Sequence, residues 1–232
     1  MDQIIKIAKD NNLFIIEDVA ESLGASFEDK KLGSLGDISC FSFFANKIIT
    51  SGEGGMALTN DHTLFEKLSS LREYGSNNNE KYIYDNVGFN YRMTNMQAAV
   101  GLAQLENFDE IIKKRDKQLL IYEKFLLGSD YFQLSPNVKN RKSVHWLLTL
   151  LTKKNNARDK IIDSLFNKGI EARKMIYPAY YSKPYKSYGN AKLYPIAEKI
   201  SLNSFHLPSS INLTMDEIKF IVDSLKKIIL EI

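Results

Sequence analysis

FSFFANKIITSGEGGM, residues 41–56, is the stretch around which the rest of the chain can be interpreted. It continues a β-prone run, residues 38–44, which contains Ser42 and is followed by Lys47. The glycines of TSGEGG allow the backbone to come close to a ligand, because they carry no side chain. An amine beside such a backbone suits a cofactor with a carbonyl group, which forms a Schiff base with lysine. The same pattern is also typical of a solvated lysine at the end of a strand, and that alternative stays open here.

The composition indicates a globular protein with one large domain or two smaller ones in its 232 residues. The formal net charge is only +3, and lysines are mixed with acidic residues along the predicted helices, so no nucleic-acid surface is expected. The single cysteine, Cys40, excludes an internal disulfide, fits a reducing compartment and is expected to be a small core residue. The sequence contains no apolar run of membrane-spanning length, and its start, MDQIIKIAKD, lacks the apolar segment of a signal peptide. We therefore expect a cytoplasmic protein without a membrane partner.

Two apolar runs predict neighbouring strands of a parallel sheet. The first, residues 13–16, has no polar alternation, as expected of a strand buried on both faces, and leads into Asp18. The second is the run 38–44, followed by Lys47. Open α/β sheets bind ligands at the carboxyl ends of their strands, which is where Asp18, Ser42 and Lys47 are expected. The alternative role of Asp18 is to cap a following helix.

The remaining pattern predicts an α/β domain over residues 1–128 and a smaller α+β domain over residues 129–232, with the boundary near Gly128. The last helix is the clearest, because Thr214 and Glu217 form a capping box at its start. Helices are predicted over residues 2–10, 61–74, 94–105, 106–127, 156–167 and 214–232, strands over 144–151 and 170–176, a hairpin over 48–59, and a polar loop over 76–81.

Metal and dinucleotide chemistry match the sequence poorly. The three histidines, His62, His145 and His206, have no partner at metal-ligand spacing, and no CxxC occurs. GEGG is too short for a phosphate-binding loop, and no GxSxG is present. A pyridinium cofactor, by contrast, needs a carboxylate at its ring nitrogen, a lysine for the Schiff base, and hydroxyl and amide donors for its phosphate. The carboxylate, hydroxyl and amine described above supply that set.

Several long motifs occur in a fixed order. EDVAESLGAS is followed by GSLGDISCFSFFANKIITSGEGG and GFNYRMTNMQAAVGLAQLE, and then by HWLLTLL, RDKIIDSLFNKGIEAR and FHLPSS. Together they resemble the DegT/DnrJ/StrS family of nucleotide-sugar aminotransferases, and within it the perosamine synthases. The resemblance implies an α/β fold: a partial type I pyridoxal-phosphate transferase large domain, of the aspartate aminotransferase type, followed by a smaller α+β domain. It further implies a homodimer with shared active sites, and a chain that corresponds to the C-terminal portion of such an enzyme.

The resemblance also implies roles for individual residues. Lys47 resembles the lysine that links to pyridoxal 5'-phosphate and moves the proton, Ser42 the phosphate-binding serine, and Asp18 the partner of the pyridine nitrogen. Glu21 sits where the family places a side chain near the 3-hydroxyl of the cofactor, with an ordinary place in the first turn of a helix as its alternative. Asn90 resembles the residue that reaches the cofactor phosphate of the neighbouring subunit.

Two further residues are expected to contact substrates. Arg92 is expected to bind an anionic group of the sugar substrate or the amino donor, because its guanidinium fork suits carboxylates; its alternative is a salt bridge in the dimer. Tyr180 stands close to where the family commonly has a histidine near the sugar.

The implied reaction transfers an amino group from glutamate to a 4-keto-6-deoxy nucleotide sugar for surface polysaccharide such as O-antigen. The alternative is a catalytically incompetent half that acts only with a complementary N-terminal segment or a partner. Sugar dehydration is disfavoured, because dehydratase relatives replace the lysine that is present here as Lys47.

Overall fold

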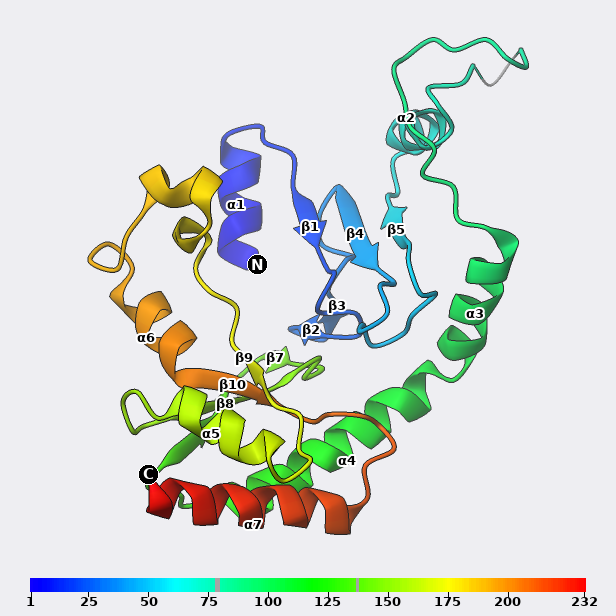
Figure 1. The fold of residues 1–232 in the computed structure, drawn as a ribbon. Coiled ribbons are helices and arrows are strands. Elements are labelled where there is room, and N and C mark those ends of the chain that lie inside the picture. The colour runs from blue at the N-terminus through cyan, green and yellow to red at the C-terminus, as the bar shows by residue number, and fades with distance from the viewer. Residues whose placement is uncertain (78–79, 137) are drawn as a thin grey trace. The chain divides into compact units, whose positions relative to one another are not determined.

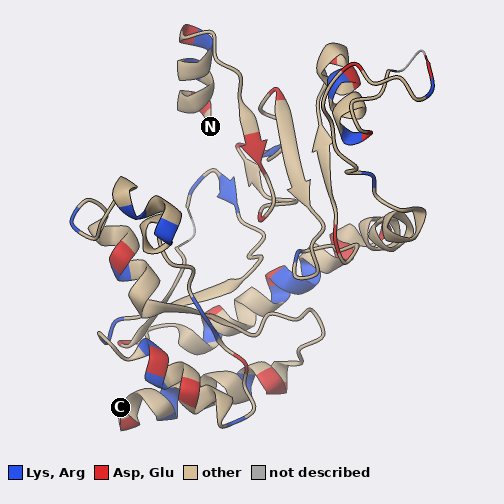
Figure 2. Cartoon of the chain, turned by 45° about the horizontal axis from the view of Figure 1, so that its top comes forward, with Lys and Arg blue, Asp and Glu red and all other residues tan. Residues whose placement is uncertain are grey.

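A computed structural model describes residues 1–77, 80–136 and 138–232, which form two compact units. The first unit contains Met1–Ile112 and the described residues of Asn137–Trp146, and the second contains Lys113–Pro136 and Leu147–Ile232. Of the predicted loop 76–81, residues 78–79 lie outside the described part. Figure 2 shows Lys and Arg interspersed with Asp and Glu along the helices of the units.

The first unit is built on a three-stranded sheet with the order β1-β4-β5 (Figure 1). Strand β1 (Ile16–Asp18) runs parallel to β4 (Ile38–Ser42), with Asp18 opposite Cys40. Strand β5 (Gly55–Leu58) pairs antiparallel with β4. The parallel pair confirms the predicted arrangement, so the carboxyl ends of β1 and β4 lie side by side.

Three helices and a small sheet complete the first unit. The helices begin and end close to the predicted positions, and two of them start at a side chain that caps the first turn: Asp61 accepts a hydrogen bond from Leu64 N–H, and Thr94 forms a capping box with Gln97. The elements are α1 (Asp2–Asp10), α2 (His62–Arg72), α3 (Asn95–Glu106), and the antiparallel strands β2 (Ser26–Phe27), β3 (Lys30–Lys31) and β7 (Arg141–Lys142) in the order β3-β2-β7.

Two strand predictions in the first unit are wrong. The run 13–16 was expected to be a buried strand, but only its last residue belongs to β1, and Phe14 is 80% exposed, because β1 lies at an edge of its sheet. The predicted hairpin over residues 48–59 is replaced by the β4–β5 pair. Ile48 and Ile49 are buried in the interior instead of pairing as a strand, and burial of their apolar side chains stabilises the first unit.

Cys40 is exposed, which corrects the expectation of a core residue. Successive side chains of a strand point to opposite faces of the sheet. In β4 the neighbouring Ser39 takes the buried face, so Cys40 points the other way.

The second unit contains an antiparallel sheet with the order β6-β8-β10-β9, and helices that pack on it. Its core joins apolar side chains of α4, α5 and α7 to those of the strands, and Figure 1 shows α5 and α7 side by side. The elements are α4 (Phe108–Leu126), β6 (Phe132–Leu134), β8 (Leu148–Thr152), α5 (Arg158–Phe166), β9 (Arg173–Lys174), the 3₁₀ helices η1 (Ala179–Tyr181) and η2 (Lys183–Tyr188), α6 (Pro195–Asn203), β10 (Ser204–Leu207) and α7 (Met215–Glu231).

The units differ from the predicted domains 1–128 and 129–232 in where α4 belongs. The chain leaves the first unit within this helix, because Tyr122 and Leu126 pack into the core of the second unit. The predicted strand over 144–151 begins only at Leu148, because Val144 is buried in the first unit. The predicted strand over 170–176 is reduced to β9, since Ile170 joins the second core. The division into domains at residue 128 stays a prediction.

Helix α7 confirms the predicted capping box. The hydroxyl of Thr214 accepts a hydrogen bond from Glu217 N–H at 3.2 Å, and the Glu217 carboxylate accepts one from Thr214 N–H at 2.7 Å. The N–H and hydroxyl of Thr214 lower the pKa of Glu217 below its ordinary value. A lowered carboxylate pKa stabilises the fold above the unfolded pKa of Glu, and this contribution is lost as the pH falls through the folded value.

We expect Thr214→Ala to lower the free energy of unfolding by about 1 kcal/mol at pH 7. Thr214→Ser keeps the hydroxyl and is the matched control. Urea denaturation measures both variants, and the difference between their free energies of unfolding is expected to shrink as the pH falls through the lowered pKa of Glu217. Equal stability of the Ala and Ser variants at pH 7 would contradict this account of the cap.

Candidate active site

Lys47 lies in the turn that follows β4. Its backbone N–H donates to the carbonyl of Phe44 at 3.0 Å, and its side chain is only 13% exposed. The Nζ atom lies 3.5 Å from Oε1 of Glu21 and 4.0 Å from the ring centroid of Trp146. Lys47 is therefore not the solvated lysine at a strand end that the sequence left open as an alternative. The amine is held between a carboxylate and an aromatic ring.

Asp18 and Ser42 stand at the ends of the two parallel strands. Oδ1 of Asp18 accepts a hydrogen bond from Ala20 N–H at 3.0 Å, and the following residues form turns, so Asp18 does not cap a helix. Ser42, two residues beyond the partner of Asp18 in β4, accepts a hydrogen bond from Phe44 N–H at 3.3 Å. Glu21 follows Asp18 in the turn and is the residue that pairs with Lys47. These four predicted residues therefore lie on or just beyond neighbouring strand ends.

Glu17 was not predicted, and it fixes this arrangement. Its buried carboxylate accepts three backbone hydrogen bonds, from Gly33 at 2.9 Å and from Leu35 and Gly36 at 2.7 Å each. These donors belong to the loop that leads into β4. Glu17 therefore connects β1 to the loop that precedes β4, and holds Asp18 in register with β4. The signal in the sequence was the first carboxylate of EDVAES, directly before Asp18.

We expect Glu17→Gln to lower the free energy of unfolding by roughly 1–3 kcal/mol, because the amide keeps one acceptor oxygen and turns an NH₂ donor toward a backbone donor. The exposed Glu28→Gln is the control, with an expected change within about 0.5 kcal/mol. Guanidinium denaturation measures both. If both variants unfold at the same guanidinium concentration, Glu17 does not hold the loop that leads into β4.

The glycine-rich segment beside β4 is clamped to helix α3. The side chain of Gln104 accepts a hydrogen bond from Thr50 N–H at 3.1 Å and donates one to the Thr50 carbonyl at 2.6 Å. Gly54, with φ +119°, accepts a hydrogen bond from Phe43 N–H. This backbone conformation requires a glycine. The segment is therefore a fixed wall next to the end of β4.

Asn90 and Arg92 lie in the first unit, in the segment after α2. Nη1 of Arg92 forms an ion pair with Oε1 of Glu73 at 2.7 Å, and Oδ1 of Asn90 accepts a hydrogen bond from Arg92 N–H at 3.4 Å. Their contacts are thus with the end of α2, and not with Lys47 or Asp18. Contact with an anionic substrate requires Arg92 to share or leave Glu73.

Tyr180 belongs to the second unit, in η1. Its hydroxyl donates to Oε2 of Glu198 at 2.5 Å, and the hydroxyl of Tyr181 donates to Oε1 of the same carboxylate at 2.6 Å. Removal from water, together with the hydrogen bond to Glu198, raises the pKa of Tyr180 to about 12. The phenol is therefore neutral near pH 7, and its proton is committed to Glu198.

Within the described residues, no group of three His, Cys, Asp or Glu side chains is placed to hold a metal ion. In the same residues, no helix is both long and apolar enough to cross a membrane.

Known proteins with similar sequences include sugar aminotransferases. The family model described as the DegT/DnrJ/EryC1/StrS aminotransferase family matches residues 1–226. The chain is 38% identical to a GDP-perosamine synthase of Escherichia coli O157:H7 and 40% identical to one of Caulobacter vibrioides, over 231 and 232 residues. The alignments cover 98% and 99% of this chain and 61% and 62% of those relatives, so the chain spans about three fifths of their length.

Solved structures show the same fold. PseC of Helicobacter pylori, an aminotransferase involved in the biosynthesis of pseudoaminic acid, matches with a TM-score of 0.89 and 28% identity, covering 100% of this chain and 63% of that one. DesV of S. venezuelae matches with a TM-score of 0.88 and 28% identity, covering 98% of this chain and 61% of that one. The fold is therefore a part of the α/β fold of type I pyridoxal-phosphate transferases.

Proposed function

Because this chain belongs to the DegT/DnrJ/EryC1/StrS aminotransferase family, we propose that it forms the lysine-bearing part of a pyridoxal 5'-phosphate-dependent sugar aminotransferase. The observation that carries the proposal is the enclosed amine of Lys47, in the turn after β4. It lies 3.5 Å from the carboxylate of Glu21. Asp18 and Ser42 stand at the ends of the paired strands.

The residues present fit the cofactor. Asp18 is exposed at its strand end, and its hydrogen bond to Ala20 uses only one of its two carboxylate oxygens. The other oxygen suits a protonated ring nitrogen, since hydrogen bonds between ionised groups are among the strongest in proteins. Ser42 offers a hydroxyl for a phosphate oxygen, and Gly55, its partner in β5, lies directly opposite it.

When bound, pyridoxal 5'-phosphate supplies a carbonyl group for attachment to an amine, and a ring that accepts electrons. The side chains of this chain would do the rest. Asp18 would hold the proton on the ring nitrogen, Ser42 would bind the phosphate, and Glu21 would serve the 3-hydroxyl. Lys47 would anchor the cofactor, and its amine would move a proton at the C4 carbon of the sugar.

The proposed substrate class is supported by two relatives that match nearly the whole chain. GDP-perosamine synthases at 38% and 40% identity support a sugar aminotransferase. For this chain we propose transfer of an amino group from glutamate to a 4-keto-6-deoxy nucleotide sugar, for surface polysaccharide such as O-antigen. We assign the anionic substrate group to Arg92 and a contact with the sugar to Tyr180. The working form is a cytoplasmic homodimer in which Asn90 reaches the cofactor phosphate of the partner subunit.

The experiment adds pyridoxal 5'-phosphate to the purified protein, and then glutamate. The proposal expects a visible absorbance band with the cofactor, its loss with glutamate, and release of 2-oxoglutarate. A GDP-linked 4-keto-6-deoxy sugar is expected to restore the band as it is aminated. Absence of any absorbance band from the bound cofactor would contradict the proposal.

A second candidate is an incompetent half that acts only with a complementary segment or a partner. Exposed apolar side chains in the first unit favour it, since Phe14 is 80% exposed and Ile16 is 69% exposed. Size-exclusion chromatography, and an assay with and without a supplied N-terminal segment of a perosamine synthase, separate the two. A monomer that transaminates unaided contradicts the second candidate.

A further inference from the structure

Trp146 is held next to Lys47 by contacts of its own. Its indole N–H donates to the carbonyl of Asn46 at 2.7 Å, directly before the lysine in the chain. Its ring packs on the small core that contains Ile48 and Val144. The Nζ atom of Lys47 lies 4.0 Å from the ring centroid. One side chain thus fixes the turn that carries the lysine and also contacts the amine.

The backbone next to Trp146 has an unusual conformation. His145 has φ +45°, in the left-handed region that residues with a side chain seldom adopt. The preceding Val144 is buried, and the N–H of His145 donates to Oγ of Ser143 at 3.2 Å. Buried Val144 on one side and the hydrogen bond of the half-buried Trp146 on the other hold this turn in place. Such strain persists only where the surrounding structure enforces it, and it is common at functional sites.

We propose that Trp146 is a positioning residue for Lys47. Its ring and the Glu21 carboxylate hold the ammonium group of the lysine whenever that group is not linked to cofactor. The role in catalysis rests on the proposed function, whereas the hold on the lysine does not. A lysine side chain has several rotatable bonds, and without these contacts it would spread over many conformers. A cation over an indole face is attracted by the ring, and the nearby carboxylate adds to that attraction.

This arrangement keeps the amine at the end of β4, within reach of the place where Asp18 and Ser42 would hold the cofactor. The contact is a resting position, with Nζ 3.5 Å from Glu21 and 4.0 Å from the ring centroid, and the lysine leaves it when it reacts. Trp146 acts through Lys47 and needs no contact with cofactor or substrate.

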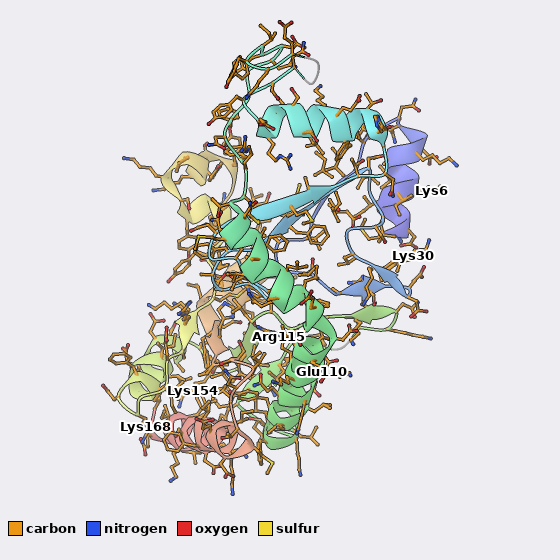
Figure 3. All side chains as sticks on the ribbon, turned by 90° about the vertical axis from the view of Figure 1, so that its right-hand side faces the viewer. Lys6, Lys30, Glu110, Arg115, Lys154 and Lys168 are labelled. Atoms are coloured by element: carbon orange, nitrogen blue, oxygen red, sulfur yellow. The ribbon has the colours of Figure 1, made fainter. Side chains whose placement is uncertain are left out.

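The first test measures how fast Lys47 is acetylated by dilute acetic anhydride in protein freed of cofactor, with each modified lysine identified by peptide mass spectrometry. Lys6 and Lys30, both exposed, are the internal reference, and Figure 3 shows them on α1 and on the β2–β3 hairpin. In Trp146→Leu, the acetylation rate of Lys47 relative to that of Lys6 and Lys30 is expected to rise about two- to five-fold. This factor corresponds to the free energy of an exposed cation–π contact. In Trp146→Phe, which keeps an aromatic face, the rise is expected to be smaller.

An unchanged ratio in Trp146→Leu would overturn the proposal, and so would equal ratios in the Leu and Phe variants. Circular dichroism shows whether each variant is folded. Because labelling is done without cofactor, a protein that shows the expected ratios but no cofactor band separates failure of the proposed function from failure of this inference.

The second test uses the fact that Trp146 is the only tryptophan in the sequence. All tryptophan fluorescence of the protein therefore reports on this ring. Lys47→Met, which removes the charge but keeps an unbranched side chain, is expected to shift the emission maximum, whereas Lys30→Met is expected to leave it unchanged. The same emission in wild type and Lys47→Met would contradict a charge above the ring, even if the Trp146 variants failed to fold.

Discussion

Replacing Lys47 with alanine is expected to abolish the visible absorbance band that the protein acquires with pyridoxal 5'-phosphate. The band depends on a covalent link between the cofactor and an amine. Lys47 is the lysine in the turn after β4, and its amine is held between Glu21 and Trp146. The measurement is an absorbance titration of wild type and variant with the cofactor. We expect the variant to show only the spectrum of free cofactor.

Lys30→Ala is the matched control, because Lys30 is an exposed lysine of the same unit, on β3. It is expected to titrate as wild type. Persistence of the band in Lys47→Ala, together with an unchanged wild-type titration, would show that another amine carries the cofactor.

Replacing Asp18 with asparagine is expected to lower kcat for amino transfer from glutamate by about 10²–10³, the loss seen when one fixed electrostatic partner of a transition state is removed. Asparagine keeps the shape of the side chain and removes the charge that would hold a proton on the ring nitrogen. Stopped-flow absorbance with glutamate alone measures the first half of the reaction, so the expected loss does not depend on the identity of the sugar.

The control is Asp10→Asn, at the exposed end of α1, which is expected to keep wild-type kcat. A kcat for Asp18→Asn within about two-fold of wild type would remove Asp18 from the site. Loss of cofactor binding in the variant would assign Asp18 to affinity instead of rate, and the cofactor titration separates these cases.

The parts of the fold that depend on neighbouring residues were predictable. Helix α7 begins where Thr214 and Glu217 cap it, because both partners lie within one turn of each other. The same holds for α3, which begins at Thr94. The placement of Asp18 and Ser42 at adjacent strand ends followed from a general property of parallel sheets, and the observed register confirms that pairing.

The parts of the fold that depend on residues far apart in the sequence were not predictable. Glu17 bonds to backbone groups 16 to 19 residues away, and neither its burial nor its partners follow from the residues around it. Trp146 donates a hydrogen bond to a carbonyl 100 residues away in the sequence, and it was assigned to a strand because VHWLLTLL is mostly apolar. The structure instead places its first residues in the core of the first unit and starts β8 at Leu148. Local apolar runs indicate burial, but they do not say which core receives them.

The most direct test of the central claim is the position of the covalent link between the cofactor and the protein. Purified protein is incubated with pyridoxal 5'-phosphate, the link is fixed by borohydride reduction, and the modified lysine is identified by peptide mass spectrometry. The account predicts a single dominant site at Lys47, with at most trace modification of exposed lysines such as Lys6 and Lys30. Modification spread evenly over exposed lysines, with none enriched at Lys47, would contradict it.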